Sequence, residues 1–462
     1  MPSTVGGLSS TARSGIFVHA TATLDQVPVA PGRWPVLGHT MSLLRRRFGF
    51  TSSLAPLGDL VKVYLGPLPT YVATSPDLVH QVLVTDARKF DKGVMFDRFR
   101  PFFGNGIAMS NGTFHDTQRR LVQPAFHVNR IAGYTPMMAR TAADLAGSWR
   151  AGQVVAVDQA MQQLSVVVVG RTLFATELGE TLIAEAQRFM PVVIRQGMIR
   201  ALSPGFVARL PIPGNRRFDE AISRLRGSVQ DVIDEGRGTA GDRGDVLSML
   251  LSAKDDDTGA GMTDEQLNDE VVTLLTGGIE TTGLALSWLF HEVARHPDVE
   301  RRWHQELDEV LAGRAVTHAD VPNLPYTARV VREVLRRYPI WLLMRRANTE
   351  VVLGGTRVPA GTEISFSPHA LHHDPRFFAD PGRFDPDRWA PGKVLPPGAY
   401  LPFGDGNRRC IGNHFALTEI AVAAATIGSR WRLVPLPGKK VRVKVTGAAY
   451  PDRLPMTVVP RG

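Results

Sequence analysis

The residue with the clearest chemical potential is Cys410, the only cysteine among 462 residues. It lies in the segment 403–412, which reads FGDGNRRCIG. Glycines permit a tight loop, and the two arginines, together with a helix predicted to follow the loop, favour a thiolate over a thiol. A thiolate held in this way is suited to nucleophilic catalysis, redox chemistry or metal ligation. The alternative is an inert thiol that packs like a small hydrophobic side chain.

A second unusual segment, 277–282, reads GGIETT and lies inside a long predicted helix. The helix begins at the capping box 263–266 and ends before Pro297. About 33 residues at 1.5 Å rise give ~50 Å, enough to cross a domain. Two glycines in a helix interior cost about 1 kcal/mol each. They therefore indicate either a close helix–helix contact or a place where a flat ligand or dioxygen approaches the helix.

Two pairs of charged residues share helix faces. His115 and Arg119 are four residues apart, and Glu333 and Arg336 are three apart, each on a predicted helix. Exposed pairs at such spacings contribute little to stability. Taken alone, neither pair indicates a function; opposite an anionic cofactor, the first pair would bind its carboxylates.

Several aromatic residues lie close together between residues 90 and 107. They are Phe96, Phe99, Phe102 and Phe103, and glycines follow at 104 and 106. The pattern fits either ordinary core anchors beneath a loop or the apolar wall of a ligand pocket.

The composition predicts a folded, soluble protein. Hydrophobic residues make up 44% and charged residues 21%, so the chain can bury a large core, and no low-complexity linker divides it. A single cysteine excludes an intrachain disulfide and fits a reducing cytoplasm. No stretch is apolar enough for a membrane anchor, and residues 1–26 are expected to be a disordered arm. The net charge of +9 fits an acidic protein partner, and no nucleic-acid-binding motif is present.

The cysteine loop resembles the haem-binding loop of the cytochrome P450 monooxygenases at every position of the family pattern. Further matches occur in chain order across most of the sequence: the basic pair on the helix near residue 115, the glycine, acid and threonine segment, and the Glu-x-x-Arg pair with Arg388 in FDPDRW. The resemblance implies a mainly α-helical fold with small β-sheets (an α+β fold). It also implies a single triangular domain over residues 27–462, with a long central helix.

The resemblance assigns a role to each matched residue. Cys410 is expected to be the axial ligand of haem b iron, Thr281 to hold the oxygen species through its hydroxyl, and Glu280 to connect it to solvent protons. The expected haem-binding residues are His115, Arg119, Gly277, Gly278, Arg345 (with Arg346 as the fallback), Phe403, Gly404, Arg408, Cys410 and Gly412. The residues with an expected structural role are Glu333, Arg336 and Arg388. The pocket candidates are Phe96, Phe99, Phe102, Phe103, Trp341 and Leu342.

The expected activity is the insertion of one oxygen atom from dioxygen into an apolar small molecule. The segments 210–217 and 341–346 are similar to those of actinomycete terpene oxidases, so a sesquiterpene or another secondary metabolite is the leading substrate. Macrolides, steroids and fatty acids stay open. Electrons would come from a ferredoxin and its reductase, and the protein would be a cytoplasmic monomer. A peroxide-driven peroxygenase is disfavoured by Glu280 and Thr281, and a non-catalytic haem sensor lacks a visible output domain.

Overall fold

The computed structural model describes most of the chain. The residues that it describes are 22–174, 177–203, 207, 210–238, 241–255, 257–340 and 342–461.

Regular structure is present at residues that the sequence assigns to a disordered arm. Residues 22–26, assigned above to a disordered arm, form strand β1 (Ala22–Thr23) and the short helix η1 (Leu24–Gln26). Strand β1 pairs in parallel with β8 (Thr356–Val358), a partner far away in sequence that local composition does not reveal. The remainder of the predicted arm lies outside the described residues.

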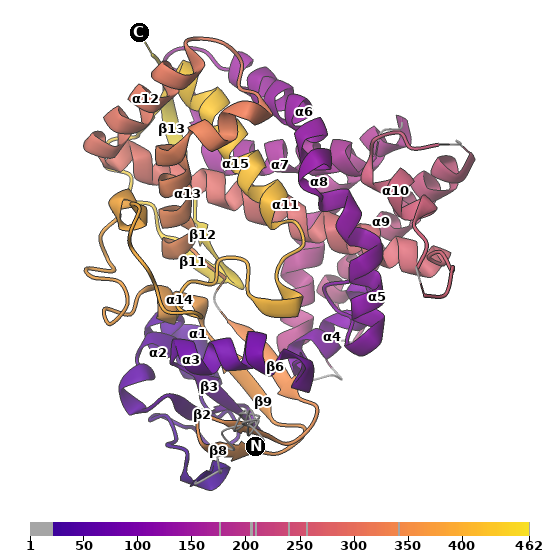
Figure 1. Cartoon of the computed structure of the whole chain (residues 1–462), viewed down its shortest axis with the longest axis vertical. Helices are drawn as coiled ribbons and strands as arrows, with labels where there is room; N and C mark the ends of the chain where they lie inside the picture. The colour runs from indigo at the N-terminus through magenta and orange to yellow at the C-terminus, as the bar shows by residue number, and fades with distance from the viewer. Residues whose placement is uncertain are drawn as a thin grey trace, which may run out of the picture.

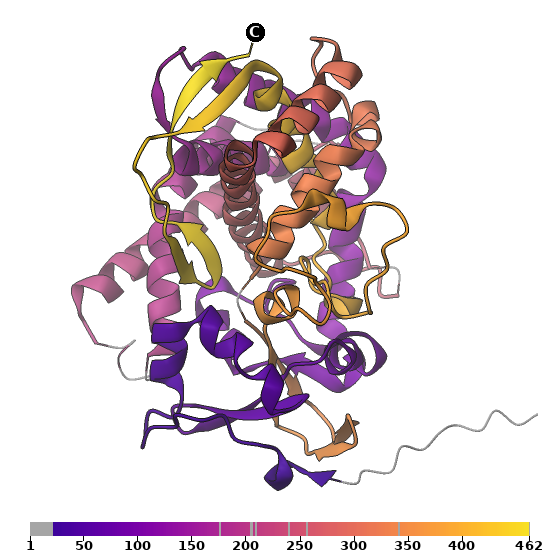
Figure 2. The same ribbon diagram turned by 90° about the vertical axis from the view of Figure 1, so that its left-hand side faces the viewer.

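The molecule is organised around helix α11 (Asp264–Arg295). The capping box of Thr263 and Gln266 starts it, and α12 (Pro297–Leu311) follows its last turn. In Figure 1 the helix crosses the helical part of the molecule, and Figure 2 looks nearly along it. The predicted long central helix is therefore confirmed.

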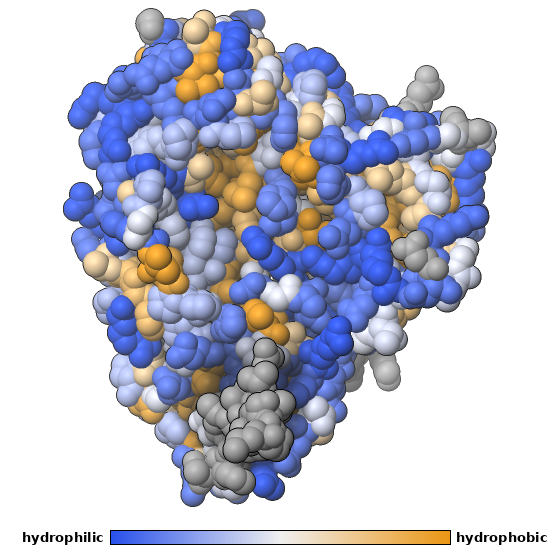
Figure 3. Space-filling model, in the orientation of Figure 1, coloured by the Kyte–Doolittle hydropathy of each residue, from blue (hydrophilic) through white to orange (hydrophobic). Residues whose placement is uncertain are grey.

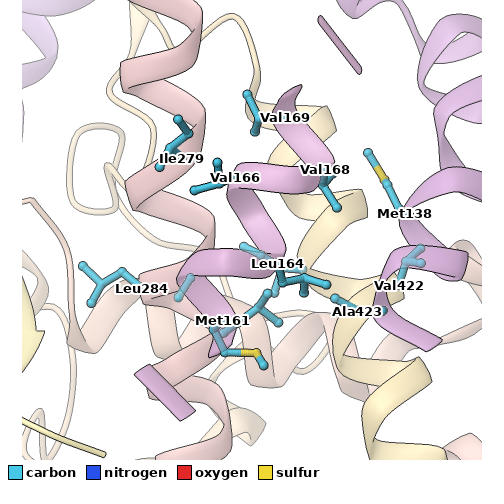
Figure 4. Packing of buried hydrophobic residues seen from close by; sticks show 14 of the residues in the cluster. Met138, Met161, Leu164, Val166, Val168, Val169, Ile279, Leu284, Val422 and Ala423 are labelled. Atoms are coloured by element: carbon cyan, nitrogen blue, oxygen red, sulfur yellow. The ribbon is translucent and has the colours of Figure 1, made fainter. Parts of the chain in front are cut away.

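Long helices form a layer with α11, which is buried over most of its length. They are α6 (Val128–Gly147), α7 (Val157–Leu173), α8 (Glu177–Leu202), α9 (Pro213–Gly238), α13 (Pro325–Arg337) and α15 (Asn413–Arg430). Figure 4 shows side chains of α7, such as Leu164 and Val168, packed against α6, α11 and α15. This helical layer forms the largest hydrophobic core.

Shorter helices join these elements. The α-helices are α1 (Thr40–Arg46), α2 (Phe48–Ser52), α3 (Pro76–His80), α4 (Val94–Phe103), α5 (Gly112–Val122), α10 (Val246–Ser252) and α14 (Pro368–His372). The other short helices are η2 (Ala55–Leu57), η3 (Gln81–Thr85), η4 (Ala87–Lys89), η5 (Gln123–Phe126), η7 (His318–Asn323), η8 (Pro386–Trp389) and η9 (Gly406–Arg408).

The strands form small separate sheets. The largest has the order β2 (Leu60–Leu65), β3 (Leu68–Ala73), β9 (Glu363–Phe366), β6 (Leu343–Ala347), β4 (Phe90–Lys92). A second sheet has the order β1, β8, β7 (Val351–Leu353). A third has the order β10 (Trp431–Pro435), β13 (Pro455–Pro460), β5 (Val154–Ala156). The strands β11 (Val443–Thr446) and β12 (Ala448–Pro451) form a hairpin. The five-stranded sheet occupies the narrow lower end in Figure 1, which gives the molecule its triangular outline. The predicted fold class is confirmed.

The surface carries mostly polar side chains. The face in Figure 3 is largely hydrophilic, with apolar residues scattered or in small groups. Within the described parts of the chain, no helix combines the length and apolar character needed to cross a membrane.

A buried ion pair on α13 ties the helical layer to the segment before the cysteine loop. Arg336 donates to both carboxylate oxygens of Glu333 at 2.9 Å, and both side chains are fully buried. Glu333 also accepts from Trp389 Nε1 at 3.0 Å and from Arg388 Nε at 3.3 Å. These contacts hold η8 against α13 and account for the structural role expected for Glu333, Arg336 and Arg388.

Removing Glu333 should strongly destabilise the fold. Glu333→Ala leaves Arg336 buried without its partner, so the free energy of unfolding should fall by about 3–5 kcal/mol. Urea unfolding followed by circular dichroism measures the change. Glu350→Ala is the matched control: Glu350 pairs with Arg357 across 3.7 Å at the exposed surface, so its loss should change stability by less than about 1 kcal/mol. Equal effects of the two substitutions would contradict the assigned role of the buried pair.

Candidate active site

The cysteine loop folds back on itself just before α15. The amide of Cys410 donates to the carbonyl of Phe403 at 2.9 Å, which closes the loop. Gly406 has a φ of +67°, and a Cβ atom there would lie 1.7 Å from the carbonyl oxygen of Leu83. Only glycine allows this approach to η3. The loop thereby presents Cys410 with its side chain accessible.

The environment of Cys410 favours a metal ligand over a nucleophile. Burial within the protein raises the pKa of the thiol above its ordinary value, although the amide of Gly412 and nearby cations, among them Arg119 and Lys92, oppose this. The nearby charges favour a thiolate, as the sequence predicts, but the desolvation cost is the larger effect and favours the thiol. A cysteine nucleophile requires a lowered pKa, whereas a metal ion deprotonates a coordinating thiol directly.

The middle of α11 has one open face. Gly277 and Thr281, which are one turn apart, are exposed although the helix runs through the core. Ile279, which lies between them in sequence, and Thr282, which follows Thr281, are buried. A Cβ atom on Gly277 would meet no atom within 4 Å. Thr281 Oγ1 donates to the carbonyl of Gly277 at 2.8 Å. A flat ligand therefore has room against this face of the helix.

Gly278 has a different role from the one expected. A Cβ atom there would lie 2.8 Å from Cγ2 of Val169 on α7. The glycine thus allows two helices to pack closely, and it does not border the open face. Of the two explanations for the glycine pair, ligand approach fits Gly277 and helix packing fits Gly278.

The acid Glu280 is half-buried beside the open face. Burial raises the pKa of its carboxyl group, while a side-chain hydrogen bond with Tyr450 lowers it. The neighbouring Thr282 faces away: its hydroxyl lies 2.9 Å from Ser165 Oγ, which donates to Glu419 at 2.9 Å. The alcohol and the acid that border the open face are thus Thr281 and Glu280.

Five basic side chains gather near Cys410. Burial and, after it, the charges of four cations lower the pKa of His115 to about 3, so all four lie near this imidazole. Those four cations are Arg408, Lys92, Arg119 and Arg345. Arg119 also donates to the carbonyl of Arg409 within the cysteine loop at 2.8 Å.

Strand register brings Lys92 and Arg345 together. They are directly opposite each other in the antiparallel pair β4–β6, and both are buried. Like charges directly opposite in a sheet are destabilising, and burial together with Arg345 and Arg408 lowers the pKa of Lys92 well below its ordinary value. Arg346 points the other way, toward Asp97 at 2.8 Å and Glu363 at 2.6 Å. The inward arginine is thus Arg345 and not the fallback.

The cation cluster fits the two propionate groups of haem. Arg408 has one weak ion pair, 3.7 Å to Asp91, and the described residues provide no ion pair for Lys92, Arg119 or Arg345. His115 Nδ1 and Arg408 Nε are buried without a hydrogen-bond partner in the described structure. An anionic ligand would satisfy both the excess charge and these donors. Together with an accessible cysteine and an open helix face, the residues present fit haem b.

The aromatic candidates divide between the core and the site. Phe102 packs edge-on against Phe218 of α9 at 5.0 Å, and Phe99 against Phe103 at 5.8 Å. Phe103 is buried in the main core, so Phe102 and Phe103 are core anchors. Phe96 lies 4.6 Å below the ammonium group of Lys92 and thus near the cation cluster.

The two candidates before Arg345 are only partly described. Leu342 is half-buried just ahead of β6, where the chain enters the sheet that carries the inward arginine. Trp341 lies outside the described residues.

Three residues near the site belong to no sequence motif, so the sequence alone does not identify them. Lys92 has no motif around it, and only its strand pairing places it opposite Arg345. Tyr450 lies in β12, twenty residues after the end of α15, and it is close enough to Glu280 to affect its pKa. Glu419, on α15, is fully buried, and burial raises its pKa to about 8. The position of Glu419 on a helix after the cysteine was the only available sequence signal.

Known proteins resemble this chain over nearly its full length. Residues 28–453 match the family model for cytochrome P450. The chain is 47% identical over 436 residues to cyclooctat-9-en-7-ol 5-monooxygenase of Streptomyces melanosporofaciens, covering 94% of this chain and 95% of that protein. It is 38% identical over 437 residues to pentalenene oxygenase of Streptomyces avermitilis, covering 94% and 97%. The crystal structure of the cytochrome P450DA heme domain matches with a TM-score of 0.85 at 28% identity, covering 94% of this chain and 98% of that one.

The fold and the cation-lined site beside the cysteine fit the class of haem-binding monooxygenases. The family match and the similarity to these relatives show that the chain belongs to the cytochrome P450 family. It is a cytochrome P450 monooxygenase, and its cofactor is haem b.

Lys92 should contribute to haem retention. Lys92→Met removes one charge-assisted contact available to a propionate, so haem should transfer to apomyoglobin roughly tenfold faster. Lys89→Met is the matched control, because Lys89 lies three residues away at the surface and pairs with Asp86 at 2.7 Å. Equal transfer rates for the two variants would remove Lys92 from the haem site.

Proposed function

We propose that the protein hydroxylates an apolar terpenoid, with a sesquiterpene as the leading candidate, within a single domain spanning residues 27–462. The observation that carries the haem chemistry is the group of buried cations without sufficient anions around Cys410. The terpenoid substrate is supported by the names of the relatives: one acts on the cyclic alcohol cyclooctat-9-en-7-ol, and another on pentalenene.

The cysteine loop and the basic residues would hold the cofactor. Cys410 would supply the thiolate ligand, and the backbone of Phe403, Gly404 and Gly412 would shape the loop around it. The propionates would be bound by Lys92, Arg119, Arg345, Arg408 and His115. When bound, haem with a thiolate ligand supplies the activation of dioxygen for insertion into a C–H bond.

The centre of α11 would transfer protons and keep bulky side chains away from the open face. Gly277 keeps one face of the helix free of side chains, and the Thr281 hydroxyl already bonds to the carbonyl of Gly277 at 2.8 Å. While it donates there, the hydroxyl oxygen can accept a hydrogen bond from a polar group at the open face, and Glu280, half-buried beside it, exchanges protons with solvent. The acid and the alcohol thus form a short route for protons to the open face.

Substitution of Cys410 tests haem ligation. Reduced parent protein under carbon monoxide should show the red-shifted Soret band of a thiolate-ligated haem, and Cys410→Ala should lose it because no thiolate remains. Arg409→Ala is the matched control, since it alters the adjacent side chain and keeps the ligand. If the red-shifted Soret band persisted in Cys410→Ala, the assignment of Cys410 as the haem ligand would be wrong.

The same haem spectrum can identify the substrate class. A panel of terpenes, macrolides, steroids and fatty acids is scored by the spin-state change that each produces in the ferric protein. Terpenoids should give the largest change at the lowest concentration; a response confined to fatty acids would favour the peroxygenase alternative.

A ferredoxin with its reductase is the proposed electron source, acting on a cytoplasmic monomer. Few cations near the cysteine loop are placed to meet this partner. Arg120 is paired with Asp255 at 2.9 Å and Asp257 at 3.1 Å, and Arg408 is largely buried in the cation cluster. Arg409 stays exposed beside Cys410 and is the best-placed cation for an acidic partner.

Charge reversal at Arg409 should weaken partner-dependent turnover. Arg409→Glu opposes attraction of an acidic ferredoxin, so the loss should be larger at low salt than at high salt. Arg357→Glu is the control, because Arg357 is exposed on the β1–β8–β7 sheet, away from the cysteine loop. The measurement is ferredoxin-supported turnover across a salt series; an effect independent of salt would contradict electrostatic steering.

A further inference from the structure

The segment 27–58, near the start of the described chain, concentrates exposed apolar side chains. Among the described residues, fifteen large apolar side chains are exposed, and six of them lie in this segment: Val29, Trp34, Val36, Leu37, Leu44 and Leu57. Trp34 is 54% exposed, whereas every other described tryptophan is buried or half-buried. Single exposed apolar residues need no explanation, but a group of them indicates an interaction surface.

A strained turn presents Val36, the most exposed apolar side chain of this segment. Trp34 and Gly38 exchange backbone hydrogen bonds at 2.8 and 2.9 Å, which closes a short hairpin. The amide of Leu37 donates to the carbonyl of Pro35 at 2.6 Å, so Val36 lies at the centre of a γ-turn, with a φ of +61°. This conformation is unfavourable for a β-branched side chain, and at 86% exposure Val36 gains little packing in return. Backbone strain of this kind persists mainly at functional sites.

The same segment is strongly basic. It contains no aspartate or glutamate and four arginines, which are Arg33, Arg45, Arg46 and Arg47. All four side chains are exposed, and the described structure gives none of them a carboxylate partner. Several exposed arginines elsewhere have one; Arg302, for example, pairs with Asp387 at 2.7 Å. The segment therefore combines exposed apolar side chains with positive charge that no nearby acid offsets.

The arginines of α1 lie on the side of that helix from which the hairpin extends. A Cβ atom on Gly32 would lie 3.8 Å from Oγ of Ser42, so the chain just before the hairpin runs against this side of α1. Arg45 and Arg46 follow Ser42 by three and four residues and thus share its helix face. The positive charge and the apolar hairpin tip therefore lie on neighbouring parts of one surface.

We propose that the segment 27–58 is a peripheral docking surface for an anionic lipid bilayer, with the hairpin tip in the membrane interface and the arginines against the headgroups. Tryptophan favours the membrane–water interface, and arginines are attracted to anionic lipids, so the charge and the apolar side chains both match this partner. A fluid lipid surface takes up a protruding side chain such as Val36 without a preformed pocket. A protein partner would need a pocket of matching shape.

Docking of this kind has a consequence for the supply of substrate. An apolar substrate concentrates in lipid, because transfer of apolar surface out of water is favourable. A protein held at the bilayer surface would meet such a substrate at a higher local concentration than in water. This consequence rests on the proposed substrate class, whereas the docking itself does not.

Sedimentation of the full-length holoprotein with lipid vesicles tests the proposal. Vesicles of phosphatidylglycerol and phosphatidylcholine should carry the protein down at low salt, and high salt should release it. Vesicles of phosphatidylcholine alone should carry much less, because they offer the arginines no net negative charge. If the protein stays in the supernatant with the anionic vesicles at low salt, the proposal is wrong.

Charge reversal on α1 tests the role of the arginines. Arg45→Glu combined with Arg46→Glu should lower binding to the anionic vesicles by at least about tenfold. Arg140→Glu combined with Arg150→Glu is the matched control, because it changes the net charge equally at two exposed arginines within and just after α6. An equal loss in both double variants would show that only the total charge matters, which contradicts a docking surface at 27–58.

Substitution of Val36 separates insertion of the hairpin tip from damage to the fold. Val36→Gly removes the apolar tip and relieves the strain at a positive φ, so vesicle binding should fall several-fold while the melting temperature does not fall. Val394→Gly is the control, since Val394 is 92% exposed on the chain between η8 and the cysteine loop. Binding that is unchanged in Val36→Gly, or reduced equally in Val394→Gly, overturns the insertion of the tip.

The remaining outcomes identify a different occupant of the surface. If the parent protein ignores vesicles but forms a dimer that Val36→Gly dissociates, the surface binds a second copy of the chain and the lipid proposal is wrong. Loss of the haem assignment through Cys410→Ala would leave the vesicle results unaffected, because the segment 27–58 contains none of the residues assigned to the haem site.

Discussion

Uncompensated positive charge is the constraint on which the site depends. Removing a single ion from water costs several kcal/mol unless a partner of opposite charge is present. Here Lys92 and Arg345 are directly opposite on adjacent strands, and Arg408 lies close to both. The surrounding framework has its own buried ion pair, between Glu333 and Arg336. We propose that a dianionic cofactor would stabilise this cluster, because its negative charges would offset the repulsion among the cations.

The central helix has to meet two opposing requirements. It must pack tightly enough to organise the helical layer, and it must leave one face open in its middle. Consecutive residues meet these requirements separately, since Gly278 admits α7 to within contact distance, whereas Gly277 faces open space. Thr281 and Thr282 differ in the same way, the first exposed and the second bonded toward Ser165 and α15. A rotation of 100° per residue is sufficient to separate these functions, so no break in the helix is required.

Features that depend on local spacing could be predicted from the sequence, whereas features that depend on long-range pairing could not. The cysteine loop, the Glu280–Thr281 pair and the helix ends are all encoded within a few residues of one another. Lys92 joins the site only because β4 pairs with β6, more than two hundred residues later in the chain. The acidity of Cys410 could not be judged either, since charge is visible in the sequence and desolvation is not. Gly278 illustrates a third limit of the sequence. A glycine indicates that another group lies close to the backbone, but not whether that group is a ligand or a neighbouring helix.

A comparison with two other buried carboxyl groups explains why Glu280 suits proton exchange. Burial raises the pKa of Glu270 and Glu419 to about 8, so both are largely neutral near pH 7. Glu270 accepts from the amide of Ile107 at 3.1 Å, and Glu419 is bonded to Ser165; both side chains are fully buried. Neither can exchange a proton with water without opening the core. Glu280 keeps partial exposure, so its carboxyl group can exchange a proton with water while the core stays closed.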